Sequence, residues 1–239
     1  MSHNFKALLG ATMVMVAFSA TNAVVAQATE KFHCSVEPCA LTLEPDGATT
    51  TAHHVFIVKN AGGESGSFTC SSLAGDATTT TKTTEEITTT ALAYGGTCKI
   101  NGVTSFNVRM NECDYLFTSK IEAGGTGGGA TIHIQCPTAK HIEIENIGTG
   151  CIFEVTPQTL RGAHYHSIGT PGTGSTETTV EARVSTAASG TGVAVEVAKE
   201  GTGCVPKSKV GETLTGEYTT GNTLVTAEKD DTGVEGWWE

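Results

Sequence analysis

The sequence predicts an all-β protein, a disulfide-stabilised antiparallel β-sandwich. Apolar and polar residues alternate with a period of two in many short runs, and no long run has the three- and four-residue spacing of an amphipathic helix. Threonine, which suits half-exposed strands, is abundant, and aromatic residues make up only 6% of the chain. The runs give roughly ten to twelve strands, too many for one open sheet, so they should stack as a sandwich or close as a flattened barrel.

The first 28 residues read as a secretory signal peptide. Lys6 supplies the positive start, an uncharged apolar run follows, and small residues lead up to Ala28. The final Ala-Gln-Ala predicts cleavage after Ala28, with cleavage after Ala23 or Ala26 as alternatives. The apolar run is shorter than the ~20 residues of a membrane-spanning helix, so a membrane anchor is the less favoured interpretation. We therefore expect a secreted or extracellular protein.

Residues 29–227 should form the all-β sandwich domain, an ordinary length for one domain. Two β subdomains divided near residues 120–130, where glycines are dense, are the alternative organisation. Residues 228–239 read as an acidic tail that ends in Trp237-Trp238. We expect one tryptophan ring to pack on a sheet edge and the other to face solvent, with a disordered end or an exposed docking peptide as alternatives, and the rest of the tail should be loose.

The predicted strands before the glycine-rich turn at 122–129 share the period-two pattern. In the first of them His54, Phe56 and Val58 face one side. The threonine-rich run at 77–90 is assigned to exposed strands, because apolar residues continue from it toward Cys98; a disordered or glycosylated loop is the alternative. These strands are 53–59, 66–73, 77–90 with its continuation, 105–110 and 113–119.

The stretch 130–155 has the clearest alternation and reads as three short strands joined by turns. Ile132 and Ile134 point one way in the first strand, and His133 points the other. Pro137 ends this strand, because proline has no N–H for the ladder. The later predicted strands are 178–186, 192–199 and a final hairpin within 213–226 that turns about Thr220-Gly221-Asn222.

The cysteine pattern predicts a disulfide framework. An even number of cysteines in an exported chain favours disulfides over a metal–thiolate site, and no C-x2-C pair is present. Cys113 and Cys136 are equidistant from Gly124-Gly125, so a hairpin there would bring their thiols together. Eight cysteines allow 105 pairings, which leaves the connectivity an inference. The other expected pairs are Cys70 with Cys98, Cys151 with Cys204, and Cys34 with Cys39.

The charge of the chain limits its partners. The formal net charge is -11, and an acidic surface repels phosphate backbones, so nucleic acid is an unfavourable partner. No segment after the signal is apolar enough to span a membrane. We expect a partner in the cell envelope or outside the cell, of a kind that the sequence does not specify.

Candidate sites for chemistry are few. The sequence has no nucleophile motif, phosphate-binding loop, dinucleotide fingerprint or H-E-x-x-H, so no catalytic residue and no cofactor are predicted. His164 and His166 stand two apart, and a strand would present both on one face as ligands for Zn²⁺ or Cu²⁺. A second polar cluster would form if neighbouring strands carry its members, which are His133, His141, Glu143 and Glu145.

A set of short motifs is spread over most of the chain after the signal. The motifs are Phe32-His33; His54, Phe56 and Val58 in one strand; Thr69-Cys70; Asn111 with Cys113, Tyr115 and Phe117; Ile134 with Cys136-Pro137; and Cys151 with Pro157-Gln158. With these motifs the chain resembles a group of uncharacterised secreted proteins of high-GC soil bacteria. It differs in Glu112, where that group tends to have glycine, and in the extra pair Cys34 and Cys39. The resemblance implies export and a disulfide-tied β fold, and it implies no activity.

The function expected from the sequence is therefore non-enzymatic. An exported β-sandwich would act by surface contact, as a structural or binding module of the cell envelope. The alternative is a metal-binding protein, or a metal-dependent enzyme, that uses His164 and His166.

Overall fold

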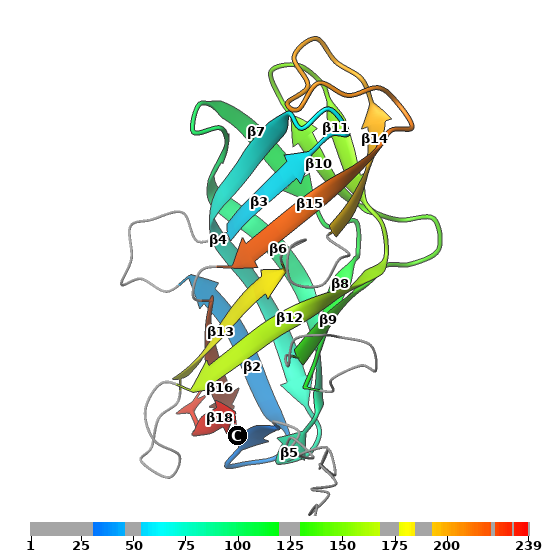
Figure 1. Ribbon diagram of the computed structural model, residues 1–239. Helices are drawn as coiled ribbons and strands as arrows, with labels where there is room; N and C mark the ends of the chain where they lie inside the picture. The colour runs from blue at the N-terminus through cyan, green and yellow to red at the C-terminus, as the bar shows by residue number, and fades with distance from the viewer. Residues whose placement is uncertain are drawn as a thin grey trace, which may run out of the picture.

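The protein is an all-β fold, as the alternation predicts. The computed structural model describes residues 31–45, 54–119, 130–167, 177–184, 193–220, 223–230 and 232–238, and these residues form strands and turns but no helix. A 15-stranded sheet makes up most of the fold, and a separate three-stranded sheet lies at its lower end (Figure 1). All strand pairs in both sheets are antiparallel.

The main sheet closes on itself as an eight-stranded antiparallel β-barrel. Two long strands, β4 (Ser65–Thr79) and β6 (Glu86–Ile100), pair with each other and run along the wall without interruption. At every other position of the wall, two shorter strands follow each other end to end. In chain order these are β2 (Cys39–Pro45) and β3 (His54–Lys59), β7 (Thr104–Arg109) and β8 (Asp114–Thr118), β9 (Ala130–Gln135) and β10 (Ile142–Asn146), β11 (Ile152–Val155) and β12 (Gln158–Ser167), β13 (Glu177–Val184) and β14 (Val193–Lys199), and β15 (Thr213–Thr220) and β16 (Thr223–Lys229).

The registers show that these short strands lie end to end. On β4, His54 of β3 is opposite Cys70, and Leu43 of β2 is opposite Gly75. An upper ring consists of β4, β6, β7, β10, β11, β14, β15 and β3, and a lower ring of β4, β6, β8, β9, β12, β13, β16 and β2. Because the rings share β4 and β6, they stack into one long barrel (Figure 1).

The prediction of a β-sandwich is wrong, because the last strands pair with the first. β15 pairs with β3, and β16 pairs with β2, so the sheet closes into a tube. Alternation could not show this closure, since an inward apolar face is common to sandwiches and barrels. The number of strands also gave no indication of closure, because twelve of them share six positions of the wall in pairs. Eight positions close into a barrel whose interior side chains can fill.

The predicted hairpin within 213–226 is wrong as well. In the described part of the chain β15 and β16 do not pair with each other. Both pair with β13, where Thr219 is opposite Arg183 and Thr223 is opposite Val180. The chain therefore continues in the same direction from β15 into β16.

The stretch 130–155 forms the three predicted strands, β9, β10 and β11. Ile132, Ile134, Ile142 and Ile144 are all buried, as the alternation requires. β10 and β11 form a hairpin, with Glu145 opposite Ile152. β9 and β10, in contrast, lie end to end, because β9 pairs with β8 and β10 with β7.

The four predicted disulfides are all present. Cys70 and Cys98 face each other directly on β4 and β6. The bridge between Cys113 and Cys136 joins the break between β7 and β8 to the break between β9 and β10. The other two bridges lie toward the ends of the barrel and connect Cys151 with Cys204 and Cys34 with Cys39.

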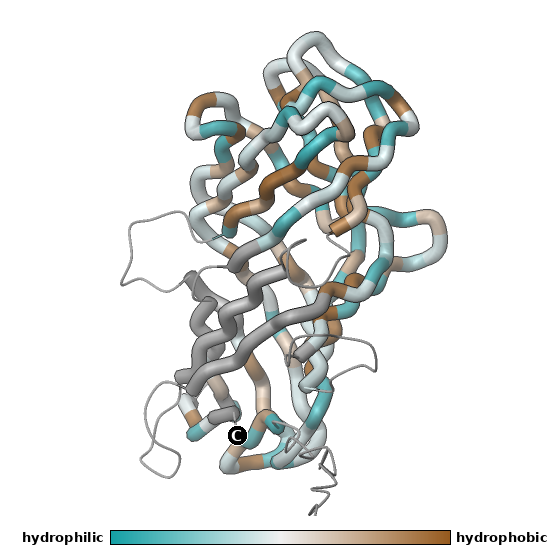
Figure 2. Tube along the Cα trace, viewed as in Figure 1, coloured by the Kyte–Doolittle hydropathy of each residue, from teal (hydrophilic) through white to brown (hydrophobic). Residues whose placement is uncertain are grey.

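The barrel interior holds the hydrophobic core. Hydrophobic and hydrophilic residues alternate along the strands (Figure 2), and the buried partners of each alternation point inward. In the upper ring the Phe68 ring makes edge-on contacts with Phe106 and Phe153, with centroid distances of 5.4 and 5.5 Å. Such contacts add to the stabilisation from burial of the rings themselves.

A three-stranded sheet covers the lower end of the barrel. Its middle strand β1 (Phe32–Cys34) pairs with β5 (Thr83–Thr84), in the connection between β4 and β6, and with β18 (Gly236–Trp238). β18 also lies against β12 and β13, on the opposite side of the lower ring. Trp237 and Trp238 of the predicted tail thus lie in β18, and the segment before them, which was expected to be loose, contains the short β17 (Thr232–Gly233), which pairs with β16.

Candidate functional site

A cavity lies inside the barrel where the upper and lower rings meet. All eight positions of the wall contribute side chains to it. The centre of a water molecule could occupy about 60 Å³ of this cavity. One water needs about 10–15 Å³ of such space, so the cavity has room for about four to six waters, or for one small aromatic ring.

The lining of this cavity is apolar except for one polar group of side chains. Among the described residues that line it there is no Asp, Glu, Lys or Arg. The hydrogen-bonding side chains are His54 from β3, Tyr94 from β6, Tyr115 from β8 and Tyr218 from β15. These four residues are called the His–Tyr chain below.

The members of the His–Tyr chain are joined by consecutive hydrogen bonds. The distance from His54 Nδ1 to the Tyr218 hydroxyl is 3.2 Å. The hydroxyls of Tyr218 and Tyr94 are 2.6 Å apart, and those of Tyr94 and Tyr115 are 2.9 Å apart. The His54 imidazole also packs edge-on against the Tyr94 ring, with centroids 5.5 Å apart. Tyr115 is therefore the end of the chain opposite His54.

A β-bulge directs Tyr94 into the barrel. In the first part of β6, Ile87 and Thr89 are buried, and an unbroken alternation would bury Ala91 next. Ala91 instead has a φ of 55°, a left-handed conformation that is rare for a residue with a side chain, and the β4–β6 register shifts nearby. A bulge moves the following residues to the other face. Leu92 and Tyr94 therefore point inward.

Thr89 fixes the backbone of Tyr115. Its side chain is fully buried, and its hydroxyl donates a hydrogen bond to the Tyr115 carbonyl at 3.1 Å. The same hydroxyl accepts a hydrogen bond from the Tyr115 N–H at 3.0 Å. The Thr89 hydroxyl thus replaces the backbone hydrogen bonds of a ladder pair at the point where β6 and β8 separate.

The tyrosines of the chain stay neutral far above physiological pH. Burial, followed by the electrostatic influence of a neighbouring tyrosine, raises the pKa of Tyr94, Tyr115 and Tyr218 well above 10. A neutral His–Tyr chain in an apolar cavity favours a neutral ligand. A charged ligand would lose its hydration there, and no charged residue in the described lining would offset that free-energy cost.

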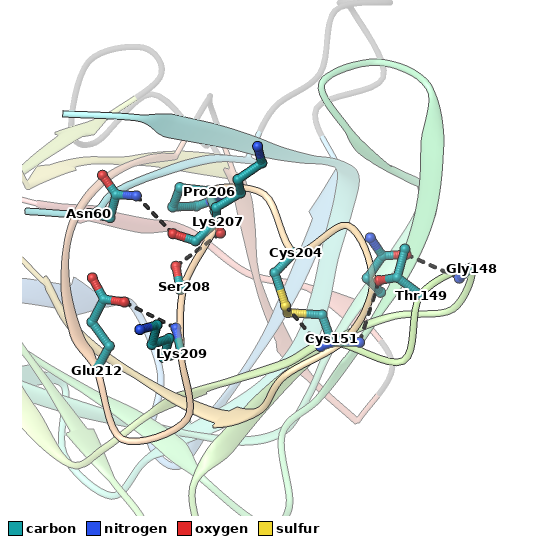
Figure 3. The surroundings of a disulfide bond; sticks show 12 residues. Asn60, Gly148, Thr149, Cys151, Cys204, Pro206, Lys207, Ser208, Lys209 and Glu212 are labelled. Atoms are coloured by element: carbon teal, nitrogen blue, oxygen red, sulfur yellow. Dashed lines mark hydrogen bonds between the residues drawn. A yellow bond between two sulfur atoms is a disulfide. The ribbon is translucent and has the colours of Figure 1, made fainter. Parts of the chain in front are cut away.

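The upper end of the barrel is crossed by the loop between β14 and β15, shown in Figure 3. The disulfide from Cys204 to Cys151 ties this loop to the start of β11. On the other side of the rim, Asn60 Nδ2 donates to the Lys207 carbonyl at 2.8 Å. Pro206 and Ser208 are buried between these attachments. The loop is therefore fastened across the upper rim.

Two glycines allow this close seating. A Cβ on Gly201 would lie 2.3 Å from the carbonyl oxygen of Thr149, and a Cβ on Gly66 would lie 2.4 Å from that of Val205. Both contacts are with backbone atoms, which cannot move aside easily. Among the described residues, this loop lies over the upper end of the barrel and the three-stranded sheet over the lower end.

Two members of the predicted polar cluster form ion pairs with an arginine. Glu143 and Glu145 project from the outer face of β10, and both accept hydrogen bonds from Arg109 on the neighbouring β7. Such exposed pairs contribute little to stability. Sequence reasoning placed the carboxylates on one face correctly but could not supply Arg109 as their partner.

The two histidines of that cluster do not converge with it. His141 Nδ1 lies 3.2 Å from Glu154 Oε2, and His133 Nδ1 lies 2.9 Å from Thr159 Oγ1. β9 and β10 lie end to end, so His133 is not beside Glu143. Among the residues that the structure describes, no group of three His, Cys, Asp or Glu could hold a metal ion.

The predicted metal pair, His164 and His166, lies in β12. The backbone register places His164 opposite Glu181 and His166 opposite Thr179 on β13. The side chains of these four residues lie outside the described part of the structure. A metal site at this pair therefore stays a prediction.

Sequence reasoning missed the His–Tyr chain, although part of its signal was present. His54 was placed on the same face as Phe56 and Val58, and a histidine on an apolar face is unusual in itself. Tyr115 stands two residues after Cys113 in the predicted strand 113–119, so alternation places both side chains on one face. Tyr94 and Tyr218 gave no signal, because a bulge and a long-range strand pairing position them.

No protein-family model, curated protein or solved structure matches the chain. In the described part of the chain, no helix is long and apolar enough to cross a membrane. The four disulfides agree with folding in an oxidising compartment.

Proposed function

We propose that the chain is an exported, non-catalytic binding protein whose ligand occupies the cavity inside the barrel. The observation that carries the proposal is a buried His–Tyr chain at the edge of an otherwise apolar cavity. Eight-stranded barrels either fill their interior with side chains or hold one small ligand. Sites for small molecules are typically apolar with a few placed polar groups, and this cavity follows that pattern.

The hydrogen-bonding capacity of the His–Tyr chain indicates the ligand class. Each tyrosine has one proton to donate. If His54 Nδ1 accepts, the protons run from Tyr115 through Tyr94 and Tyr218 to His54, and the Tyr115 oxygen can accept from a ligand. If Nδ1 carries the proton, the order reverses, and Tyr115 can donate to a ligand. A hydroxyl group suits both states, so the proposed ligand is a small neutral alcohol or phenol with an apolar body.

The test compares 4-fluorophenol with fluorobenzene, followed by fluorine NMR. We expect saturable binding of both at one site, with the phenol bound roughly threefold to tenfold more tightly, as one net hydrogen bond provides. Tyr115→Phe should remove this difference while fluorobenzene binding persists. Equal affinity of the two probes for the unmodified protein would contradict the proposed role of the His–Tyr chain.

A matched pair of variants separates cavity binding from surface binding. Val155 lines the cavity and is 5% exposed, so Val155→Phe should fill the space and abolish binding. Val103 lies in an exposed turn at 78% exposure, so Val103→Phe should leave binding unchanged. Binding that survives Val155→Phe, or that is absent from the unmodified protein, would overturn the proposed function.

A further inference from the structure

The wall of the barrel has an interruption in its ladder between β6 and the β7–β8 position. β6 pairs with β7 at Lys99–Ser105 and Ile100–Thr104, and it pairs with β8 from Glu86–Thr118 to Thr88–Leu116. Between these two short ladders, the described residues 89–98 and 106–115 make no ladder pair across the gap. This segment is called the side window below. β6 stays paired with β4 on its other side.

A surface groove lies over the side window. It is lined by the later part of β6 and by β7, and it includes exposed Thr97 and Asn107. Three of its lining residues, Tyr94, Phe106 and Val108, also line the internal cavity. Outer groove and inner cavity are thus separated by the thickness of these side chains.

We infer that ligands enter and leave the cavity through the side window, with Tyr94 as the gate. This inference rests on the proposed function. In the part of the chain that the structure describes, the fastened upper loop and the three-stranded sheet lie over the two ends of the barrel, which favours a route through the wall. The ladders bound the side window, and the hydrogen bonds between Thr89 and Tyr115 close its lower margin.

The gate is a side chain that can move without breaking the sheet. As a whole residue Tyr94 is half-buried, in contrast to Tyr115 and Tyr218, which are buried. Its hydroxyl is held by both of these tyrosines. Swinging the ring outward breaks these two hydrogen bonds and the edge-on contact with His54, and it leaves the β4–β6 ladder intact, so these side-chain contacts set the barrier to opening. The same movement exposes the Tyr115 hydroxyl to the arriving ligand.

The experiment measures the association and dissociation rates of 4-fluorophenol by fluorine NMR exchange. Asn107 faces the groove but does not line the cavity, so Asn107→Trp should block the route and leave the site intact. Both rates should fall by about tenfold or more, while the Kd stays within about twofold. The matched control is Val210→Trp, an exposed position at 60% in the upper loop, which should change neither rate.

Two further variants distinguish the routes. Tyr94→Phe removes both hydrogen bonds of the gate and should raise both rates by about tenfold. Releasing the upper loop with Cys151→Ser and Cys204→Ser should leave the rates unchanged. If both rates rise when the loop is released and stay unchanged in Asn107→Trp, the side window is not the route. That outcome would leave the proposed function intact. Absence of saturable binding to the unmodified protein would overturn both.

Discussion

Alkaline titration gives the sharpest test of the buried His–Tyr chain. The protein has four tyrosines in all. Three of them, Tyr94, Tyr115 and Tyr218, belong to the His–Tyr chain, and burial raises their pKa well above 10. In the unfolded state each ionises near its usual pKa of about 10. Above that pH the native state therefore binds more protons than the unfolded state, and stability falls as the pH rises. The stabilisation is complete below pH ~10.

The size of the effect follows from the number of protons retained. Each tyrosine that stays protonated only in the native state lowers the free energy of unfolding by about 1.4 kcal/mol per pH unit, so three lower it by about 4 kcal/mol per unit. A protein with about 5–10 kcal/mol of stability should then unfold between about pH 11 and 12.5.

The assay follows tyrosinate absorbance and far-ultraviolet circular dichroism together. We expect the absorbance of three tyrosinates to appear in one cooperative step, at the pH where the β-sheet signal is lost. Tyr115→Phe should reduce the step to two tyrosinates and the slope by about a third. Reversible ionisation of all four tyrosines near pH 10, with the β-sheet signal retained, would refute the buried chain.

Three stability predictions follow from single contacts, each measured by urea unfolding without reductant. Thr89→Val should destabilise by roughly 2–4 kcal/mol, because it leaves the Tyr115 N–H and carbonyl unpaired; an effect below 1 kcal/mol would exclude that role. The matched change Thr79→Val should be neutral or stabilise by about 1 kcal/mol, because among the described residues this buried hydroxyl has no partner; a clear loss of stability would mean that it has one. Removing the Cys151–Cys204 bridge, with a sequence separation of 53, should cost about 4 kcal/mol, against about 2 for Cys34–Cys39, with a separation of 5; the reverse order would contradict a loop-entropy origin.

Much of the local structure follows from the sequence. The positions of β3, β9, β10, β11 and β14 agree with period-two alternation, because one face of each strand meets the core and the other does not. The four disulfides were also predictable, because spacing about turns brings two cysteines together when strands pair as neighbours. The inward direction of His54 was predictable in the same way, because alternation places it on the same face as Phe56 and Val58.

The closed barrel and its cavity were decided by tertiary structure alone. Alternation indicates which face of a strand is buried, but it does not indicate which strands pair with each other. A sandwich and a barrel therefore give the same sequence pattern. Pairing of β15 with β3 joins segments more than 150 residues apart and has no local signal. The bulge at Ala91 then reverses the facing of Tyr94, against the simple alternation. The His–Tyr chain needs both events, because its members come from four separate strands that only closure brings around one cavity.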